Sequence, residues 1–313
     1  MRKLLLIAIT ILPILMGYSL YLFDLNWQLE NLAAFVVFIP LYYLLLTAIM
    51  LVSRSVKFSL FSFCAGIISA VTFGAIPMNN SQQECRPDAV SVLQYNTYYD
   101  NNQIGVFIDF AREQRPDILV LQEVSPIHGE QLKLLGDLYP YQYGGQRRVG
   151  YPSGQMILSR SPMYGMNTVT SISGHNIIRV VWRASEDKNL FLIAAHPPSP
   201  RTKALWLQRN EVIEDVRTMA EASPLETVLV VGDFNLASTT SRFNNMLPGF
   251  ESWPVASWPV FIKRWTLPAK PVIAIDHFWI RNARSDDQTI CSRERIRHIN
   301  GSDHAPIETR FNL

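Results

Sequence analysis

Carboxylate, amide and imidazole side chains recur at the ends of segments that the sequence predicts to be β-strands. The clearest case is 228–235, where a run of aliphatic residues ends at a glycine and is followed by Asp233 and Asn235. Such an apolar, β-branched run is typical of a strand that is buried on both faces. Rigid strand ends suit groups that must be held in fixed positions. Gly-Asp is also an ordinary turn sequence, so this motif alone is equally consistent with a structural role.

Six further polar residues lie at or just beyond comparable strand ends. Carboxylate and amide oxygens suit a hard divalent cation such as Mg²⁺ or Mn²⁺, and two histidines are too few soft ligands for a structural zinc site. A cation, a carboxylate that holds a water and an imidazole near the leaving group are what hydrolysis of a phosphate ester requires. Each residue alone has an ordinary explanation as a cap, an ion pair or a surface turn, and it is the combination that favours chemistry. The six are Asn96, Glu123, His196, Asp276, Asp303 and His304.

The elements that must position these residues are mostly strands, with helices between them. Strands that outnumber helices favour packed sheets flanked by helices over a simple array of βαβ units. The stretches 139–154 and 241–271 lack periodicity and are predicted to be irregular. Helices are predicted after Asn101, with an apolar face at i, i+3 and i+4, and at 203–222. Besides the 228–235 segment, strands are predicted at 89–95, 118–121, 155–159, 177–182, 190–194, 272–280 and 305–311.

Three long uncharged stretches precede this array. Each is near the ~20 apolar residues that a helix needs to cross a bilayer, so we expect three transmembrane helices. A cleaved signal peptide is the alternative for the first stretch, but its apolar region is long and two more apolar stretches follow it. The predicted helices span about 4–23, 32–52 and 58–77, within a membrane anchor at 1–78 that is followed by a linker at 79–88 and an outer domain at 89–313.

The charges around these stretches predict an orientation. Arg2 and Lys3 precede the first helix, and Arg54 and Lys57 lie between the second and the third. Since positive residues stay in the cytoplasm, three crossings would place everything after about Pro77 outside. The sequence therefore predicts a multi-pass protein of a bacterial inner or cytoplasmic membrane, with its outer domain on the periplasmic or extracellular side.

The cysteines fit an outer domain loosely. Cys85 and Cys291 both fall on the predicted outer side, where oxidising conditions permit a disulfide, with two free thiols as the alternative. Cys64 lies in the third apolar stretch and is expected to be a packing residue.

Net charge does not identify a substrate. The first 78 residues hold four of the 28 basic and two of the 26 acidic residues, which leaves 24 of each in the outer domain. A neutral domain does not indicate a nucleic-acid binder, although such a domain can carry a local basic patch. Aromatic residues at 250–265 would suit a membrane interface, or would simply pack beneath a long loop. Candidate substrate-binding cations are Arg147, Arg148, Arg201 and Lys203, together with Lys263 and Arg264; the aromatic set is Phe250, Trp253, Trp258, Phe261 and Trp265.

The sequence resembles the endonuclease/exonuclease/phosphatase superfamily, which includes deoxyribonucleases, AP endonucleases, neutral sphingomyelinases and inositol-polyphosphate phosphatases. The matching motifs occur in family order and cover essentially all of the outer domain. The membrane-anchored N-terminus looks like a bacterial branch. The motifs are 93–96, 116–123, 154–160, the strand end at His196, 232–235, 275–277 and 301–306.

The resemblance implies an α/β fold, a four-layer αββα sandwich with two central β-sheets and the site at one rim. It also implies a Mg²⁺ or Mn²⁺ ion with Glu123 as its main ligand, assisted by Asn96 and Asp303. Arg160 would be structural. Many members have Thr-His-Leu where this chain has Ala-His-Pro at 195–197, so we expect the following loop to shape a different pocket.

The same resemblance implies the acid–base roles. Asp233 would orient or deprotonate the attacking water, and Asn235 would hold a phosphate oxygen. His304, oriented by Asp276, would act as a base or stabilise the phosphorane. His196 would protonate the leaving group or bind a phosphate oxygen.

The sequence thus predicts a membrane-anchored, extracytoplasmic, Mg²⁺- or Mn²⁺-dependent phosphoesterase that hydrolyses phosphodiester bonds in the manner of a nuclease. A phospholipid or sphingomyelin phosphodiesterase is the first alternative. A catalytically inactive binding domain on the same fold is the second. The partners implied are the lipid bilayer and a phosphodiester substrate, either nucleic acid or a lipid head group.

Overall fold

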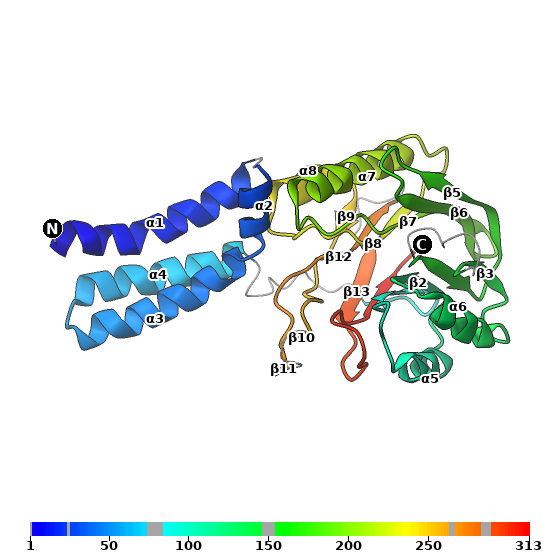
Figure 1. Cartoon of the computed structure of the whole chain (residues 1–313), viewed down its shortest axis with the longest axis horizontal. Coiled ribbons are helices and arrows are strands. Elements are labelled where there is room, and N and C mark those ends of the chain that lie inside the picture. The colour runs from blue at the N-terminus through cyan, green and yellow to red at the C-terminus, as the bar shows by residue number, and fades with distance from the viewer. Residues whose placement is uncertain (1, 24–25, 74–83, 146–153, 263–266, 283–288) are drawn as a thin grey trace. The chain divides into compact units, whose positions relative to one another are not determined.

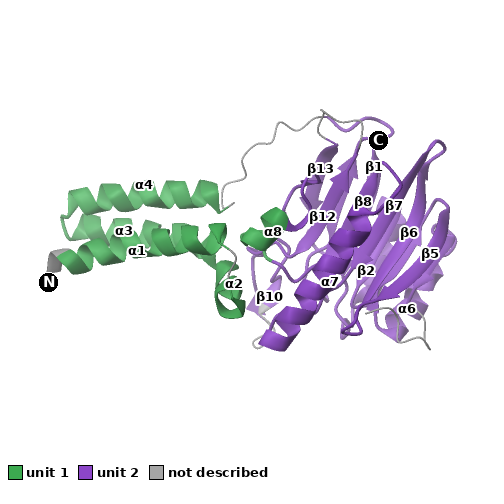
Figure 2. Cartoon of the chain, turned by 90° about the horizontal axis from the view of Figure 1, so that it is seen from above, with its two compact units in different colours: residues 1–81, 237–245 green, residues 82–236, 246–313 purple. Residues whose placement is uncertain are grey.

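The protein consists of two compact units (Figure 2), each with its own hydrophobic core. Unit 1 comprises residues 1–81 together with 237–245, and unit 2 comprises 82–236 together with 246–313. The computed structural model describes residues 2–23, 26–73, 84–145, 154–262, 267–282 and 289–313.

Unit 1 is helical. Its core is formed by side chains such as Tyr43, Leu46 and Ala65, while many large apolar side chains on the outer faces of the helices are exposed. The elements are α1 (Arg2–Leu22), α2 (Trp27–Ala33), the 3₁₀ helix η1 (Val36–Phe38), α3 (Ile39–Val52), α4 (Val56–Thr72) and all but the last residue of α8 (Ser241–Met246).

Among the described residues, two helices are long and apolar enough to cross a membrane, so the prediction of three is wrong in number. They are Leu4–Leu22 and Trp27–Val52, with mean hydropathies of 2.1 and 2.5. The third stretch forms a helix of 17 residues, Val56–Thr72, which is about 25 Å long at 1.5 Å per residue, against a hydrocarbon core of about 30 Å. Absence of charge defined the predicted stretch 58–77, but it does not mark where a helix ends. Residues 74–77 lie outside the described residues.

A short segment from the second half of the chain belongs to unit 1. Thr239 Oγ1 donates to the Ala33 carbonyl at 2.8 Å, and Arg242 Nε forms an ion pair with Glu30 Oε2 at 3.1 Å. Glu30 is buried, so this pair fixes the segment against α2 within unit 1.

Unit 2 contains two six-stranded sheets (Figure 1), in the orders β13-β14-β1-β2-β4-β3 and β5-β6-β7-β8-β12-β9. Within each sheet one central pair is parallel, β1 with β2 and β7 with β8. The first sheet comprises β1 (Val90–Asn96), β2 (Ile118–Gln122), β3 (Tyr141–Gly144), β4 (Met156–Ser159), β13 (Ile290–Arg295) and β14 (Ile307–Phe311). The second comprises β5 (Met163–Thr170), β6 (Asn176–Ser185), β7 (Lys188–Ala195), β8 (Val228–Asp233), β9 (Glu251–Ser252) and β12 (Asp276–Arg281), and a separate hairpin comprises β10 (Phe261–Ile262) and β11 (Leu267–Pro268).

The side chains of β1 show how the layers form. Val90 and Val92 face the core between the two sheets, whereas Leu93 and Tyr95 face the opposite side and pack with helix α5. Helix α7 packs on β7 and β8 of the second sheet, on the side away from α5 and α6 (Figure 1). The predicted four-layer αββα sandwich is therefore confirmed. Its helices are α5 (Ile104–Gln114), α6 (Pro126–Leu132) with the 3₁₀ turn η2 (Lys133–Leu135), and α7 (Lys203–Glu221).

A disulfide joins Cys85, five residues before β1, to Cys291 in β13. It connects the start of unit 2 to the edge strand of the first sheet. Cys64, in α4, is a free and exposed cysteine, so it does not pack in the core of unit 1 as the sequence suggested.

Candidate active site

The polar residues meet because the central strands of both sheets end at one rim. Asn96 is the last residue of β1, and Asp233 is the last residue of β8. Asp276 begins β12, which runs antiparallel to β8, and lies directly opposite Asp233 in the register. Strands from both sheets thus deliver their terminal side chains to the same place.

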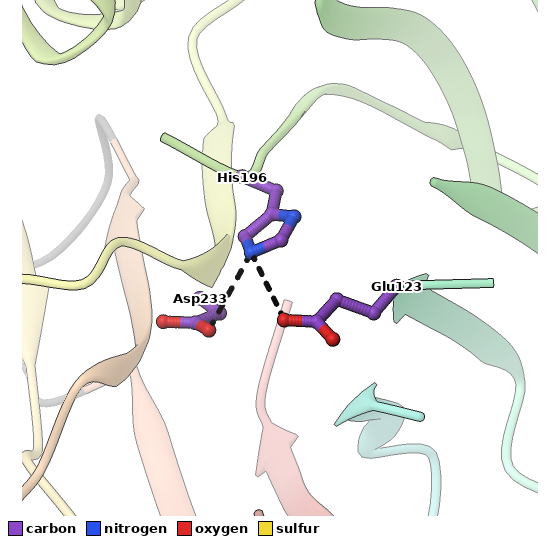
Figure 3. A group of neighbouring side chains, drawn as sticks. All are labelled: Glu123, His196 and Asp233. Atoms are coloured by element: carbon purple, nitrogen blue, oxygen red, sulfur yellow. Dashed lines mark ion pairs between the residues drawn. The ribbon is translucent and has the colours of Figure 1, made fainter. Parts of the chain in front are cut away.

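Glu123, His196 and Asp233 form a first group (Figure 3). His196 Nε2 lies 3.8 Å from Glu123 Oε1 and 3.7 Å from Asp233 Oδ2, and one ligand atom from each residue falls within 4.8 Å of the others. Asp233 is buried, while Glu123 and His196 remain partly accessible. Two carboxylates and an imidazole at this spacing form a donor set that fits a hard divalent cation.

Asn96 lies between the two carboxylates of this group. Its amide nitrogen donates to Glu123 Oε1 at 3.1 Å and to Asp233 Oδ2 at 2.9 Å, and its oxygen accepts from the Tyr98 N–H. The two ends of an amide are distinguished by their hydrogen bonds, and in this orientation Asn96 holds the carboxylates together. A ligand role for its oxygen would require the amide to turn over, and that role stays a prediction.

Asp233, Asp276 and His304 form a second group that shares Asp233 with the first. His304 Nδ1 is 2.7 Å from Asp276 Oδ2, and its Nε2 is 3.7 Å from Asp233 Oδ2. The other oxygen of Asp276 accepts a hydrogen bond of 2.6 Å from Gln94. The imidazole ring is therefore fixed on one side by Asp276 and directs its second nitrogen toward Asp233.

The electrostatics of this group favour a charged His304. Burial alone would lower the pKa of His304, but the charges of Asp276 and Asp233 outweigh it and raise this pKa to about 10. Burial likewise opposes ionisation of Asp276, yet the facing His304 charge and its hydrogen bond hold the pKa of Asp276 below its ordinary value. Burial raises the pKa of Asp233 to about 6 against the opposing effect of His304. Asp233 is thus a buried carboxylate that a bound cation would stabilise.

Two site residues have a left-handed backbone, with φ of 50° at Glu123 and 49° at Asn235. Non-glycine residues rarely adopt this conformation, and they cluster at functional sites when they do. Asn235 is held by its own N–H on Asp233 Oδ1 at 2.9 Å and by its Nδ2 on the Pro197 carbonyl at 3.1 Å. The close approach of the strands also requires Gly232, because a Cβ there would lie 1.9 Å from the Ala195 carbonyl oxygen.

The remaining predicted residues belong to neither of these two groups or lie outside the described residues. The Asp303 carboxylate accepts a hydrogen bond of 3.1 Å from the Trp258 indole and belongs to neither group, so its role as a metal ligand stays a prediction. Arg201 and Lys203 are exposed at the start of α7. Arg160 forms an ion pair with Asp117 at 3.2 Å. Arg147, Arg148, Lys263, Arg264 and Trp265 lie outside the described residues.

Three members of the aromatic set, Phe250, Trp253 and Trp258, have ordinary contacts within the protein. Trp253 packs against the core between the sheets, and the Phe250 ring lies beneath the Arg281 guanidinium at 5.2 Å. With Trp258 bonded to Asp303, these contacts favour packing over contact with a membrane.

Three buried residues support the site, and the sequence interpretation assigned them no individual role, although Gln94 and Ser302 fall within the motifs 93–96 and 301–306. Gln94 holds Asp276, Ser302 Oγ donates to the Asn96 carbonyl at 2.7 Å, and Arg209 Nη1 donates to the Asn235 carbonyl at 3.0 Å. Two of these three residues could have been detected in the sequence from the pattern of buried positions in their strand or helix. Gln94 falls on the face of β1 that carries Val92, and Arg209 lies one turn before Val212 on the buried face of α7.

Comparison with known proteins agrees with this geometry. The model of the Endonuclease/Exonuclease/phosphatase family matches residues 93–304. A comparison with curated protein sequences finds no match.

Similar solved structures have low sequence identity. They include D. rerio TDP2 complexed with a single-strand DNA product, with 17% identity, a TM-score of 0.59, and coverage of 72% of this chain and 99% of that chain. A Staphylococcus aureus beta toxin mutant with bound magnesium ions has 14% identity, a TM-score of 0.54, and coverage of 71% and 99%. Sphingomyelinase C from Streptomyces griseocarneus has 19% identity, a TM-score of 0.50, and coverage of 72% and 99%.

These three likenesses concern the fold. With the family match across both groups of polar residues, the chain belongs to the endonuclease/exonuclease/phosphatase family.

Proposed function

We propose that this protein is a metal-dependent phosphodiesterase that acts on nucleic acid. The observation that carries the proposal is the junction at Asp233, where a group suited to a cation and an imidazole–carboxylate pair share one buried carboxylate. Members of this family are hydrolases of phosphoric esters, and the fold is shared with a DNA-bound TDP2 and with a sphingomyelinase.

In this proposal Glu123 is the main ligand of a Mg²⁺ or Mn²⁺ ion, with Asn96 and Asp303 as the further proposed ligands. A bound divalent ion would withdraw charge from a phosphate oxygen and neutralise the excess of carboxylates. One fold relative has been solved with magnesium ions.

The chain's own groups would then divide the proton transfers. Asp233, with its pKa raised to about 6, would orient the attacking water and accept its proton. His304, whose pKa is raised to about 10, carries its proton at neutral pH, so we assign it to stabilising negative charge on the phosphorane rather than to acting as a base. His196 would protonate the leaving oxygen, and Asn235 would hold a phosphate oxygen.

We also propose that unit 1 anchors the protein in a bilayer. Only 17% and 28% of the two apolar spans are buried within the protein, which is unlike the core helices of a soluble domain, although a signal sequence is the alternative for the first span. The division into an anchor at 1–78, a linker at 79–88 and a catalytic domain at 89–313 belongs to this proposal.

We propose that the catalytic domain lies outside the cytoplasm, and this proposal rests on a separate observation. The Cys85–Cys291 bond supports an oxidising, extracytoplasmic side. With two crossings and a cytoplasmic N-terminus, the charge rule would instead return the domain to the cytoplasm. Reporter fusions after Met78 separate the two. Activity only of a reporter that works outside the cytoplasm supports the proposal, and activity of a cytoplasmic reporter contradicts it.

A substrate panel tests the function. The full chain in detergent micelles with Mg²⁺ would be given single- and double-stranded DNA, RNA, sphingomyelin and phosphatidylcholine vesicles, and inositol phosphates. We expect cleavage of nucleic acid, its loss in Asp233→Asn and its retention in the exposed control Asp137→Asn. Cleavage of lipid with nucleic acid left intact would favour the phospholipid alternative. Absence of any hydrolysis would favour an inactive binding domain.

A further inference from the structure

A cavity of about 480 Å³ lies against the loop that carries Asp303 and His304. Its walls come from Val260, from residues 268–271, at the end of β11 and just after it, and from residues 295–300, at the end of β13 and just after it. Ala305, the residue after His304, also lines it. Two backbone hydrogen bonds fasten these walls to the loop, from Val260 N to the Asp303 carbonyl and from Ile296 N to the Pro306 carbonyl, both at 2.8 Å.

The lining of this cavity is basic. It includes Lys270, Arg295, Arg297 and His298 and contains no carboxylate. Arg295 donates to the Ala256 carbonyl at 3.0 Å. Within the part of the chain that the structure describes, no ion pair involves the other three side chains.

Two further features distinguish this lining. Burial and the neighbouring charge of Arg297 lower the pKa of Arg295. His298 adopts a left-handed backbone with φ of 75°, which is uncommon outside glycine. A bound anion would relieve the repulsion between Arg295 and Arg297, because each would then face a negative charge.

We propose that this cavity binds a second phosphate of a nucleic-acid strand whose scissile phosphodiester lies in the candidate active site. The inference rests on the proposed function and specifies its substrate class. A strand presents a further phosphate beside every bond that is cut, whereas a choline head group ends in a quaternary ammonium that Lys270, Arg295 and Arg297 would repel. The position of the cavity against the 303–306 loop places the second phosphate next to the acid–base residues.

The test compares two double variants of the full chain in detergent micelles. The first is Lys270→Ala with Arg297→Ala, both exposed in the wall of the cavity. The control is Arg183→Ala with Lys188→Ala, which makes the same charge change at the β6–β7 turn, at the opposite end of β7 from His196. Binding of a fluorescein-labelled single-stranded oligonucleotide is measured by anisotropy in EDTA, which prevents cleavage, and hydrolysis of bis(p-nitrophenyl) phosphate is measured with Mg²⁺.

We expect the cavity variant to raise the oligonucleotide Kd about tenfold or more relative to the control. The slope of log Kd against log salt should fall by about 0.7 for each phosphate that the variant no longer neutralises. Hydrolysis of the small diester should stay within about twofold of the control, because that substrate has no second phosphate. Equal oligonucleotide affinity in the two double variants would overturn the proposal.

The failure of this inference differs from the failure of the proposed function. If the wild type hydrolyses the small diester while oligonucleotide binding ignores the cavity, the reaction stands and the subsite does not. If the cavity variant loses binding to vesicles of anionic phospholipid but keeps its oligonucleotide affinity, the cavity belongs to a lipid and the inference is wrong. If the wild type hydrolyses no diester while oligonucleotide binding depends on the cavity, the subsite stands and the reaction does not.

Discussion

Replacing Asp276 by Asn tests whether His304 works as a cation. The carboxylate is buried and lies 2.7 Å from His304 Nδ1, while its second oxygen accepts from Gln94 at 2.6 Å. An amide of the same shape has one accepting oxygen instead of two, so it cannot accept hydrogen bonds from both Gln94 and a protonated His304 ring. Removing one partner of a buried charge pair leaves the other uncompensated, at a cost of about 3–5 kcal/mol.

We expect the imidazole to avoid this cost by losing its proton. The charge of Asp276 is the largest influence that raises the pKa of His304, and it opposes burial. In the variant, burial should prevail and the ring should be neutral at pH 7. Loss of a positioned charge or acid–base group lowers turnover by roughly 10²–10⁴-fold.

The assay is kcat for the small diester at pH 7 together with the NMR titration of the His304 ring. Asp137→Asn is the matched control, because the Asp137 side chain is 61% exposed and a change there should leave kcat near that of the wild type. A kcat for Asp276→Asn within threefold of the control, or a His304 that stays protonated at pH 7, would refute the reasoning.

Two further predictions concern the supports of the site. Arg209→Met removes the donor to the Asn235 carbonyl and should lower the free energy of unfolding by about 2 kcal/mol and kcat by about tenfold. Arg217→Met, on the same helix but with a side chain that is 39% exposed, should leave kcat unchanged. An Arg209 variant with unchanged kcat would contradict the positioning role. Burial lowers the pKa of His277 to about 4, below the 6.5 of an unfolded chain. The unfolded state therefore binds more protons between these values, and stability should fall by about 3 kcal/mol as the pH drops from 6.5 to 4. His277→Gln should reduce that part of the acid dependence in thermal unfolding, and an unchanged pH profile would contradict it.

The strand ends of the site could be predicted from local sequence because each lies in a strongly apolar segment. The run before Asp233 and the segment before Glu123 are buried along their whole length, so few other structures could accommodate them. The four-layer packing was predicted from the family resemblance that these motifs carry, and no single strand indicated it.

Other elements were missed because tertiary contacts form them. Strand β13 reads Ile-Cys-Ser-Arg-Glu-Arg, a polar pattern, yet Arg293 in its middle is buried and donates to the Asp276 carbonyl. Strand β5 is largely exposed and has no apolar periodicity to detect. The basic cavity joins residues 270 and 295–298, which are brought together by the fold and not by spacing in the chain.

The metal requirement is the most direct test of the central claim. The full chain would be freed of metal with EDTA, then titrated with Mg²⁺ or Mn²⁺ while diester hydrolysis is followed, in the wild type and in Glu123→Gln. Glu123 lies in the group with His196 and Asp233, so its neutralisation should weaken binding of the ion and raise the metal concentration for half activity at least tenfold. We predict no hydrolysis in EDTA, full recovery with either ion, and this shift in the variant. Wild-type turnover that persists in EDTA would contradict the account.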